Sequence, residues 1–435
     1  MLVVQKYGGS SLQDPDRIRR VAERVVRMHR GGHEVVIVCS AMGDTSDELI
    51  DLARQVSGDP PAREMDMLLT SGERVSNALM AMAIHDRGSS AQSLAGDQAG
   101  VFTDAAHGRA RIVEVAPDRV REALDRGSIP LVAGFQGVNR ETGDITTLGR
   151  GGSDVTAVAL AAALKADVCE IYTDVDGVFS ADPRVVRSAR PLEAITYEEM
   201  LEMAATGAKV LMSRCVEYAR RHHVDIRVRS SFTDHPGTLV SNSVGGSSAV
   251  EGSHITGVTH TRSVTRVTVE DVPVRPSATA DVLDVVAAAG IPVDMFQKTG
   301  AQKAGAQKAS AQHAGAENAS SRTELTFTVS GEDGPRVAEL LGEHRDRVGF
   351  GAVRCDGDVG QVSLVGAGVR EPGIVARLCR TLAEAGIDVQ LISASEIRLS
   401  ALCRADELDA AVRALHSGFG LDSDTYATVH AGTGR

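Results

Sequence analysis

Three polar segments in the first 240 residues carry the residue types that phosphate chemistry needs. The first, KYGGSS at residues 6–11, directly follows the apolar run Leu2–Gln5. Glycines at the end of a strand let backbone N–H groups approach phosphate oxygens, and the lysine adds a positive charge. No Gly-Lys-Ser/Thr follows, so the segment is not a P-loop, and a simple turn is the alternative interpretation.

The second segment, TTLGRGGSD at residues 146–154, leads into the alanine-rich run Val155–Leu164. The guanidinium of Arg150 can bind a carboxylate through two parallel hydrogen bonds, and the start of the following helix favours a further negative group. A helix capped by Ser153 or Asp154 is the alternative. Both can hold, because capping does not use the arginine, so we predict an anion site here.

The third segment, YTDVDGVFSADPR at residues 172–184, combines three aspartates and an arginine in a turn-rich loop. It follows the predicted strand Cys169–Thr173, and such a loop suits a nucleotide with its Mg²⁺. A calcium loop is an alternative, but the spacing and the closing glutamate of an EF-hand are missing. Turn formation alone would also account for the aspartates and the glycine.

The elements that would position these segments alternate between short β-rich runs and helical patterns. This alternation predicts an α/β fold with a largely parallel sheet. The runs Leu2–Gln5, Val35–Ser40 and Ile129–Ala133 are almost continuously apolar, as in strands covered on both faces. Between the first two, a helix is predicted to begin at Asp14 and Pro15 and to carry one apolar stripe.

The pattern changes after residues 241–254, a small and polar stretch that we predict to be a linker. It ends the predicted catalytic domain, residues 1–240. Beyond it, a strand–helix–strand–strand pattern occurs twice, which indicates two small α+β domains at 255–350 and 351–435. Residues 299–321 repeat with a period that fits neither helix nor strand. We predict a flexible insertion there, with a lysine-bearing interaction segment as the alternative.

Composition excludes several classes of function. The net charge of −12 argues against a nucleic-acid partner, because a general nucleic-acid surface needs a positive field. No apolar run approaches the ~18 residues of a membrane helix, and the N-terminal sequence has no secretory pattern. We therefore expect a cytoplasmic protein without a membrane partner. The six cysteines are scattered, which predicts reduced thiols and no zinc site or other protein-bound metal.

Taken together and in this order, the segments resemble the signatures of the amino-acid kinase superfamily, most closely those of aspartate kinases of the actinobacterial lysine/threonine-pathway type. The likeness extends over VVIVCSAMGDTSDEL, EMDMLLTSGERVSNALMAMAI, GFQGV and GAKVL, and over SLVGAG, LISASEIRLS and AGTGR near the end of the chain. The resemblance implies a parallel sheet sandwiched by helices, followed by two ACT domains that bind effector amino acids and mediate dimerisation. In the family these two domains are interwoven, so the boundary at residue 350 is approximate.

The resemblance also implies a reaction. It is the ATP-dependent phosphorylation of the β-carboxylate of L-aspartate, the first step toward lysine, threonine and methionine, with Mg²⁺ bridging the β- and γ-phosphates. In such an enzyme Lys6 contacts the transferring phosphoryl group, Lys209 contacts the nucleotide phosphates from the other side, and Asp154 orients the lysines. The other nucleotide-binding positions are Gly8, Gly9, Ser10, Thr173, Asp174, Phe179, Asp182 and Arg184.

For the substrate, the resemblance assigns Arg150 to the α-carboxylate of aspartate, with Ser153 nearby. It assigns Glu73 to the α-ammonium group, and Ser40 and Thr45 to hydrogen bonds with the substrate. Without the resemblance, Glu73 would be interpreted as a charge on a helix surface.

The effector loops depart from the family pattern at residues 270–277, 296–298 and 368–373, the last being one residue shorter than usual. We therefore expect inhibition by lysine plus threonine to be weakened or lost. The two domains can still form a homo-oligomer, and a separate regulatory subunit is an alternative partner. A non-catalytic amino-acid sensor and a kinase for an aspartate analogue are the alternative functions. The charged residues assigned above are all present, which favours an enzyme over a sensor.

Overall fold

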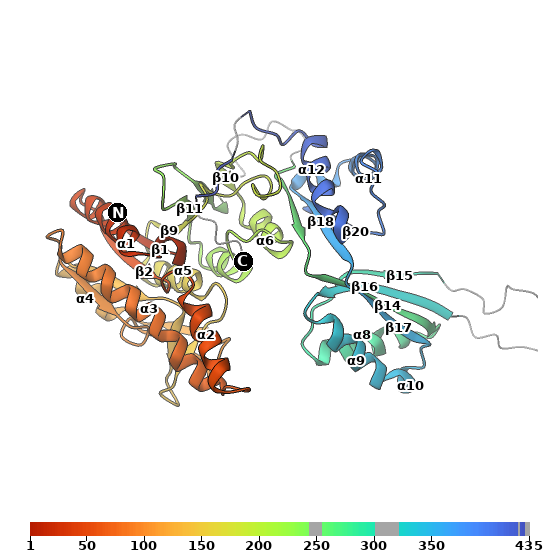
Figure 1. Cartoon of the computed structure of the whole chain (residues 1–435), viewed down its shortest axis with the longest axis horizontal. Helices are drawn as coiled ribbons and strands as arrows, with labels where there is room; N and C mark the ends of the chain where they lie inside the picture. The colour runs from red at the N-terminus through yellow and green to blue at the C-terminus, as the bar shows by residue number, and fades with distance from the viewer. Residues whose placement is uncertain (243–254, 301–321, 425–426, 431–435) are drawn as a thin grey trace, which may run out of the picture. The chain divides into compact units, whose positions relative to one another are not determined.

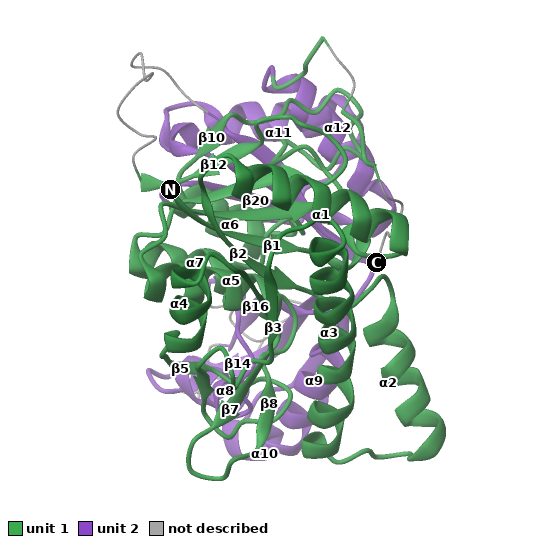
Figure 2. Cartoon of the chain, turned by 90° about the vertical axis from the view of Figure 1, so that its left-hand side faces the viewer, with its two compact units in different colours: residues 1–252, 421–435 green, residues 253–420 purple. Residues whose placement is uncertain are grey.

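The computed structural model of the protein describes residues 1–242, 255–300, 322–424 and 427–430 (Figure 1). It divides into two compact units, drawn in different colours in Figure 2. Unit 1 comprises Met1–Gly252 and Leu421–Arg435, and unit 2 comprises Ser253–Gly420. Most of the predicted linker and of the predicted insertion lies outside the described residues.

Unit 1 is built on an eight-stranded sheet with the strand order β10-β12-β11-β9-β1-β2-β6-β3. All neighbouring strands are parallel except β11 and β12, which confirms the predicted α/β fold. The strands are β1 (Leu2–Tyr7), β2 (Glu34–Cys39), β3 (Ala91–Leu94), β6 (Ile129–Ala133), β9 (Val168–Thr173), β10 (Ala194–Ile195), β11 (Ile226–Ser230) and β12 (Thr238–Val240).

Helices cover both faces of this sheet. On one face α1 (Pro15–Arg30) and α3 (Ala62–His85) share a core with the side chains of Tyr7 and Ile37. The predicted start of α1 is confirmed, because the Asp14 side chain accepts a hydrogen bond from the Arg17 N–H group at 2.8 Å. On the other face lies α5 (Gly152–Leu164), which is buried along most of its length and is accordingly rich in alanine and valine.

A smaller sheet in unit 1 has the strand order β5-β4-β7-β8. This sheet packs beside α3. Its last strand, β8, is followed by the turn before α5 in which an anion site was predicted. Its strands are β4 (Val101–Thr103), β5 (Ile112–Val115), β7 (Gln136–Asn139) and β8 (Ile145–Thr147). The remaining helices of at least eight residues in the described part of unit 1 are α2 (Thr45–Val56), α4 (Asp118–Asp125), α6 (Tyr197–Ala205) and α7 (Ser213–His222).

Unit 2 contains two four-stranded antiparallel sheets, each covered by helices. One sheet has the order β15-β16-β14-β17, with β14 (Val264–Pro273), β15 (Asp294–Lys298), β16 (Arg322–Ser330) and β17 (Ala352–Asp356). The other has the order β13-β18-β20-β19, with β13 (Gly257–Thr261), β18 (Val359–Val365), β19 (Leu391–Ala394) and β20 (Arg398–Arg404). The helices are α8 (Ala278–Ala288), α9 (Gly334–Glu343), α10 (Arg345–Val348), α11 (Ile374–Glu384) and α12 (Leu408–Gly418).

The two sheets of unit 2 do not divide the chain at residue 350, the linear boundary expected from the sequence. β13 comes before the first sheet but pairs with β18 of the second, whereas β17 comes after residue 350 and pairs with β14 of the first. The last described residues also leave unit 2, since Leu421 and the residues after it belong to unit 1. Pairing across such long stretches of chain leaves no local signal in the sequence.

No helix in the described part of the chain combines the length and the apolar composition needed to cross a bilayer. All six cysteines are free thiols, and four of them are buried.

Candidate active site

The three predicted segments meet at one edge of the large sheet. Residues 8–11 follow β1 and residue 174 follows β9, its parallel neighbour, while residue 40 follows β2 on the other side of β1. Ligands of parallel α/β sheets bind beyond the carboxyl ends of the strands. The structure therefore brings together segments that are about 170 residues apart in sequence.

A buried ion pair lies at the centre of this edge. The Lys6 ammonium is 2.6 Å from Oδ1 of Asp154, and the two side chains are 13% and 10% exposed. Lys6 extends from β1 toward α5, because its neighbour Tyr7 faces the opposite side of the sheet. Asp154 lies in the first turn of α5, where the helix dipole stabilises a negative charge.

The two glycines after β1 keep the surroundings of this ion pair open. A Cβ atom on Gly8 would lie 3.5 Å from the Lys6 ammonium, and one on Gly9 would lie 2.8 Å from the carbonyl oxygen of Gly43. The Gly43 N–H group donates to the Gly9 carbonyl at 3.1 Å. The segments after β1 and β2 can thus approach each other only with a glycine at position 9.

Glu73 lies in the middle of α3 and is only 4% exposed, so its interpretation as a helix-surface charge is wrong. One carboxylate oxygen accepts a hydrogen bond from the Ala41 N–H group at 3.3 Å. The other oxygen, Oε2, has no hydrogen-bond partner among the residues that the structure describes. Burial raises the pKa of Glu73 to about 7, although backbone N–H groups oppose the shift. A buried oxygen without a protein partner can accept a hydrogen bond from a ligand or from water.

The predicted substrate hydroxyls lie around Glu73 and the ends of β2 and β6. Ser76, one turn after Glu73, donates to the backbone oxygen of Ser40 at 2.6 Å. A Cβ atom on Gly72 would lie 3.7 Å from the methyl group of Thr45. Ser153 packs against the residue that follows β6, because a Cβ atom on Gly134 would lie 2.7 Å from its hydroxyl.

The start of α5 differs from the alternative expected from the sequence. Gly151, with a φ of +71°, is the N-cap residue, and no side chain caps the helix. Ser153 and Asp154 are therefore inside the first turn and not at its boundary. The reason is that glycine adopts the left-handed conformation without strain, while the carboxylate of Asp154 is engaged by Lys6.

Arg150 and Lys209, like Arg184 of the nucleotide segment, are exposed members of the predicted set. Arg150 lies in the turn between β8 and α5, between two glycines of positive φ, and Lys209 lies in the loop between α6 and α7. Neither side chain has an ion-pair or hydrogen-bond partner among the described residues. Both are therefore available to a ligand, and none of the described residues of unit 1 fixes their side chains.

Two residues that the sequence did not indicate hold the turn before Arg150 in place. Asp66 of α3 accepts hydrogen bonds from the hydroxyl of Thr147 and from the Gly108 N–H group. Arg214 of α7 donates to the carbonyl oxygens of Leu148 and Ala110, at 2.6 and 2.7 Å. The turn is thus fixed from two helices, and no spacing in the sequence could have shown this.

The predicted nucleotide segment folds on itself after β9. The Thr173 hydroxyl donates to Asp174 at 3.1 Å, and the Arg184 guanidinium lies 3.7 Å from the same carboxylate. Asp182 accepts a hydrogen bond from the Arg184 N–H group at 2.9 Å. Phe179 is 7% exposed and forms an isolated bridge with Pro191, so its ring packs largely inside the segment.

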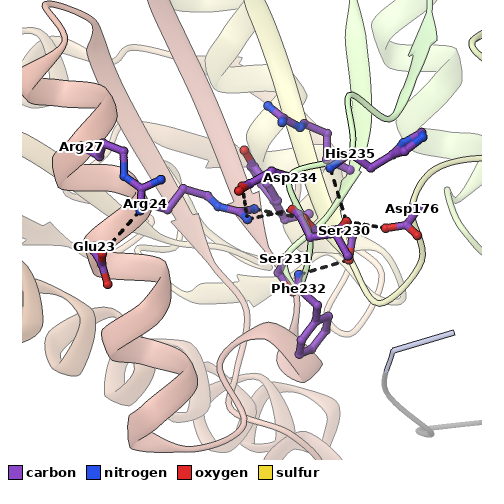
Figure 3. A network of polar contacts seen from close by, with 12 residues as sticks. Glu23, Arg24, Arg27, Asp176, Ser230, Ser231, Phe232, Asp234 and His235 are labelled. Carbon is purple, nitrogen blue, oxygen red and sulfur yellow. Dashed lines mark hydrogen bonds and ion pairs between the residues drawn. The ribbon is translucent and has the colours of Figure 1, made fainter. Parts of the chain in front are cut away.

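A second loop, residues 230–238, lies beside this segment because β11 is the parallel neighbour of β9. Figure 3 shows the polar contacts that hold it: Arg24 of α1 donates to the carbonyl oxygens of Ser230 and Thr233, at 3.0 and 2.8 Å. The Thr233 hydroxyl also donates to Asp176. The run of serine, aspartate, proline and glycine after a strand was the signal in the sequence that could have revealed this loop.

Beneath the two loops lies a buried polar cluster that the sequence analysis did not identify. The carboxylate of Glu170 accepts hydrogen bonds from Gln5 at 2.7 Å, from the Tyr172 hydroxyl at 3.0 Å and from Arg229 at 3.0 Å. The ring of Tyr172 stacks on that of Tyr7, with 4.6 Å between centroids. Polar residues inside otherwise apolar strands were the available signal.

Comparison with known proteins agrees with this geometry. The profile of the amino acid kinase family matches residues 1–230, and that of an ACT domain matches residues 362–419. The aspartokinases of Mycolicibacterium smegmatis and Corynebacterium glutamicum are 56% and 54% identical to the chain, over 100% of each sequence. The structure of E. coli aspartokinase III in complex with aspartate and ADP has a TM-score of 0.78 at 24% identity, covering 96% of this chain and 99% of that one, a likeness of fold. The chain therefore belongs to the amino acid kinase family and, within it, to the aspartokinases that carry an ACT domain.

Proposed function

We propose that the protein transfers the γ-phosphoryl group of ATP to the β-carboxylate of L-aspartate and so forms 4-phospho-L-aspartate and ADP. The observation that carries this proposal is the buried Lys6–Asp154 pair at the carboxyl ends of the strands. The unpartnered oxygen of Glu73 supports it, as does the full-length identity to aspartokinases.

The reaction itself determines what the protein must supply. A carboxylate oxygen of aspartate forms a bond to the γ-phosphorus while the bond from that phosphorus to the β,γ-bridging oxygen of ATP breaks. The β-carboxylate is already ionised at neutral pH, so no general base is needed. Two anions must nevertheless approach each other in line. Catalysis then consists of positioning the reactants and neutralising charge.

Lys6 is the group that we assign to the transferring phosphoryl oxygens. An ammonium has three N–H donors that can bind phosphate oxygens, and in the structure its charge is paired with the carboxylate of Asp154. Asp154 keeps the ammonium in position before the substrates bind, so that little reorganisation is needed during transfer. Gly8, Gly9 and Ser10 would line the same phosphates, and Lys209 would approach from its exposed loop.

Mg²⁺ would supply positive charge that neutralises the nucleotide phosphates. Among the described residues, no group of three or more metal-ligating side chains lies close together. An ion that arrives on nucleotide phosphates needs only one or two protein carboxylates. Asp174 and Asp182, which lie on the nucleotide segment with Thr173 and Arg184, supply carboxylates of this kind.

For the substrate, we assign Oε2 of Glu73 to the α-ammonium group and Arg150 to the α-carboxylate. The ammonium would provide the donor that Glu73 lacks, and its positive charge would lower the raised pKa of the carboxyl. Arg150 would close on the substrate from its exposed turn. Ser40, Thr45 and Ser153 would then hydrogen-bond the remaining substrate oxygens and hold the β-carboxylate toward the phosphoryl group.

We further propose that unit 2 acts as a pair of ACT domains through which two copies of the chain associate. Each sheet of unit 2 has two edge strands within the described chain, β15 and β17 in one sheet and β13 and β19 in the other, and these could pair with a second copy. Light scattering of the full chain should give the mass of a dimer or of a larger homo-oligomer. A monomer at micromolar concentration would contradict this assignment.

The activity is tested with purified protein, Mg-ATP and hydroxylamine, which converts an acyl phosphate into a hydroxamate. L-Aspartate should give aspartyl hydroxamate, whereas L-glutamate should give no product. A panel of aspartate analogues distinguishes a kinase with a different acceptor. Folded protein that forms no hydroxamate with any acceptor would favour the non-catalytic sensor.

A further inference from the structure

The end of the chain lies on the nucleotide segment. Residues 421–424 and 427–430 follow α12 of unit 2 in sequence but belong to unit 1. Isolated bridges join Asp422 to Ala189 and Val429 to Val175. These residues, which we call the C-terminal strap, thus contact both ends of the segment that carries Asp174, Asp182 and Arg184.

Backbone hydrogen bonds fix the C-terminal strap along this path. The Ser423 N–H group donates to the Ser188 carbonyl at 2.8 Å, and the Ala427 N–H group donates to the Arg187 carbonyl at 2.9 Å. The His430 N–H group donates to the carbonyl of Asp174 at 2.9 Å. The last of these bonds is made to a residue that we assign to nucleotide binding.

The side chain of His430 joins the two loops of the nucleotide site. Its Nε2 atom is 3.2 Å from Oδ2 of Asp176, the carboxylate that also accepts from Thr233. The ring stacks on Phe232, with 5.9 Å between centroids and an interplanar angle of 25°. On the far side of the same loop network, Arg17 of α1 lies 5.2 Å from the Phe232 ring centroid. Figure 3 shows Asp176 and Phe232 on their separate loops.

We propose that His430, with the C-terminal strap, is a positioning residue for the nucleotide site. It acts through Asp174, Asp176 and Phe232 and does not need to touch the nucleotide. Loops that a ligand must order reduce its affinity, and contacts that order them beforehand restore it. The proposal rests on the proposed function in assigning the segment to ATP, but it goes further by giving the end of the chain a part in binding it.

His430→Ala is the most direct variant, and Thr428→Ala is its matched control. Thr428 lies two residues earlier on the C-terminal strap, is exposed and has no side-chain partner among the described residues. Loss of about one hydrogen bond and one ring contact corresponds to a roughly threefold to tenfold lower affinity for the nucleotide. We expect His430→Ala to raise KM for ATP by this factor. The kcat at saturating ATP and the KM for aspartate should change less than about twofold, and Thr428→Ala should behave as the wild type.

Binding of a fluorescent ADP analogue gives a second readout that does not depend on aspartate turnover. The Kd of the His430→Ala protein should rise by the same factor as its KM for ATP, and His430→Gln, which keeps a donor for Asp176, should recover part of the loss. A chain that ends at Gly420 should show a larger rise than His430→Ala. If this truncated chain does not fold, His430→Ala and His430→Gln still decide the question.

Two outcomes would overturn the proposal. One is an unchanged Kd for the ADP analogue in folded His430→Ala protein. The other is an equal rise of KM for ATP and for aspartate together with a lower Tm, which would mean that the contact only stabilises unit 1. A wild-type protein that binds the ADP analogue but phosphorylates no acceptor would refute the proposed function. The role of His430 would then still be tested by the Kd of the variants for the ADP analogue.

Discussion

The charged groups of the candidate site fall into two regions that are built differently. Lys6, Asp154 and Glu73 extend from a strand and two helices, are almost fully buried and have fixed contacts. Arg150 and Lys209 lie on loops, are exposed and have no partner among the described residues. The buried groups are therefore in position before any ligand arrives, whereas a ligand must order the exposed ones.

This difference separates two tasks. Charge that moves during phosphoryl transfer is best stabilised by groups that need no rearrangement, and these are the buried ones. Parts of the substrates that do not react can be bound by mobile groups, which also allow entry and release. We expect loss of the buried Lys6 to affect mainly kcat and loss of the exposed Arg150 to affect mainly KM, because only Lys6 is assigned to the reacting group.

Lys6→Ala tests the buried region and should have the largest effect. Removal of one preorganised electrostatic group lowers kcat by about 10²- to 10³-fold. The substitution also leaves Asp154 without its cation, which costs roughly 3–5 kcal/mol for a buried pair. Steady-state hydroxamate formation at saturating ATP and aspartate measures the effect on kcat.

The double variant Lys6→Met/Asp154→Asn is the control for folding. It replaces the ion pair by neutral side chains of similar size, so its Tm should exceed that of Lys6→Ala while its kcat stays equally low. A folded Lys6→Ala protein with near-normal kcat would show that Lys6 does not contact the transferring group.

Arg150→Ala tests the exposed region. We expect kcat/KM for aspartate to fall by about 10²-fold, mainly through KM, because the guanidinium would bind a carboxylate that does not react. The KM for ATP and the Tm should remain close to wild type. Arg140→Ala is a matched control, since Arg140 is another exposed arginine of unit 1 and pairs with Glu114 at 2.6 Å. A fall in kcat alone would contradict the division between the two regions.

Glu73 makes the comparison sensitive to pH. Only the ionised carboxylate pairs with an ammonium group, and burial raises its pKa to about 7 in the free protein. We expect kcat/KM for aspartate to rise by about tenfold per pH unit below this value and to level off above it. The Glu73→Gln protein should have a low kcat/KM that does not vary across this range. A wild-type profile that is flat between pH 6 and 8 would contradict the assignment of Glu73.

The same shift predicts an opposite effect on stability. The folded-state pKa of about 7 lies above the unfolded value of 4.5, so the folded protein binds the extra proton between these values. This contribution is fully present below pH 4.5 and is lost as the pH rises to 7, by about 3 kcal/mol. Glu73→Gln removes this loss, so its Tm at pH 8 should exceed that of the wild type by a few degrees.

The smallest effect is expected from effectors. In unit 2, Arg275 donates to the Ser277 hydroxyl and pairs with Asp281 at 2.7 Å, which closes the loop before α8. In the altered loop at residues 368–373, the N–H groups of Val369 and Glu371 donate to nearby carbonyl oxygens, those of Gly366 and Gly368. N–H groups used in this way are not free to bind an effector amino acid. Each polar group of the effector left without a hydrogen-bond partner weakens its binding by about 1–3 kcal/mol. Lysine and threonine at millimolar levels, alone or together, should therefore lower activity by less than about twofold. Strong synergistic inhibition would show that these loops still bind effectors.

The sequence predicted those features that depend on local patterns. Apolar runs such as Val35–Ser40 identified the buried parallel strands, and the Asp14-Pro15 start identified α1. The glycine turn after β1 and the segment after β9 were found because short polar loops follow these strands. Since parallel strands end at one edge of the sheet, the meeting of these segments could also be expected.

Other features depend on contacts between distant parts of the chain. The burial of Glu73 results from packing of α3, whose own sequence has a polar stretch at this point. Asp154, in the helix that begins after Gly151, pairs with Lys6, which lies almost 150 residues earlier in the chain. The pairing of β13 with β18 and of β17 with β14 in unit 2 also depends on distant contacts. So does the path of the C-terminal strap, and no local periodicity in the sequence predicts either feature.

The discontinuity of unit 1 has a consequence for protein synthesis. A ribosome releases the chain from its N-terminus, so residues 1–252 emerge and can fold long before Leu421 is made. At roughly 5–20 residues per second, translation from Ser253 to Arg435 takes roughly 10–40 s. During that time the nucleotide segment lacks the hydrogen bonds from Ser423, Ala427 and His430. A chain whose translation stops early would carry every group assigned to phosphoryl transfer and would still lack this support. If the strap positions the nucleotide site as proposed, the order of synthesis delays tight nucleotide binding until the chain is finished.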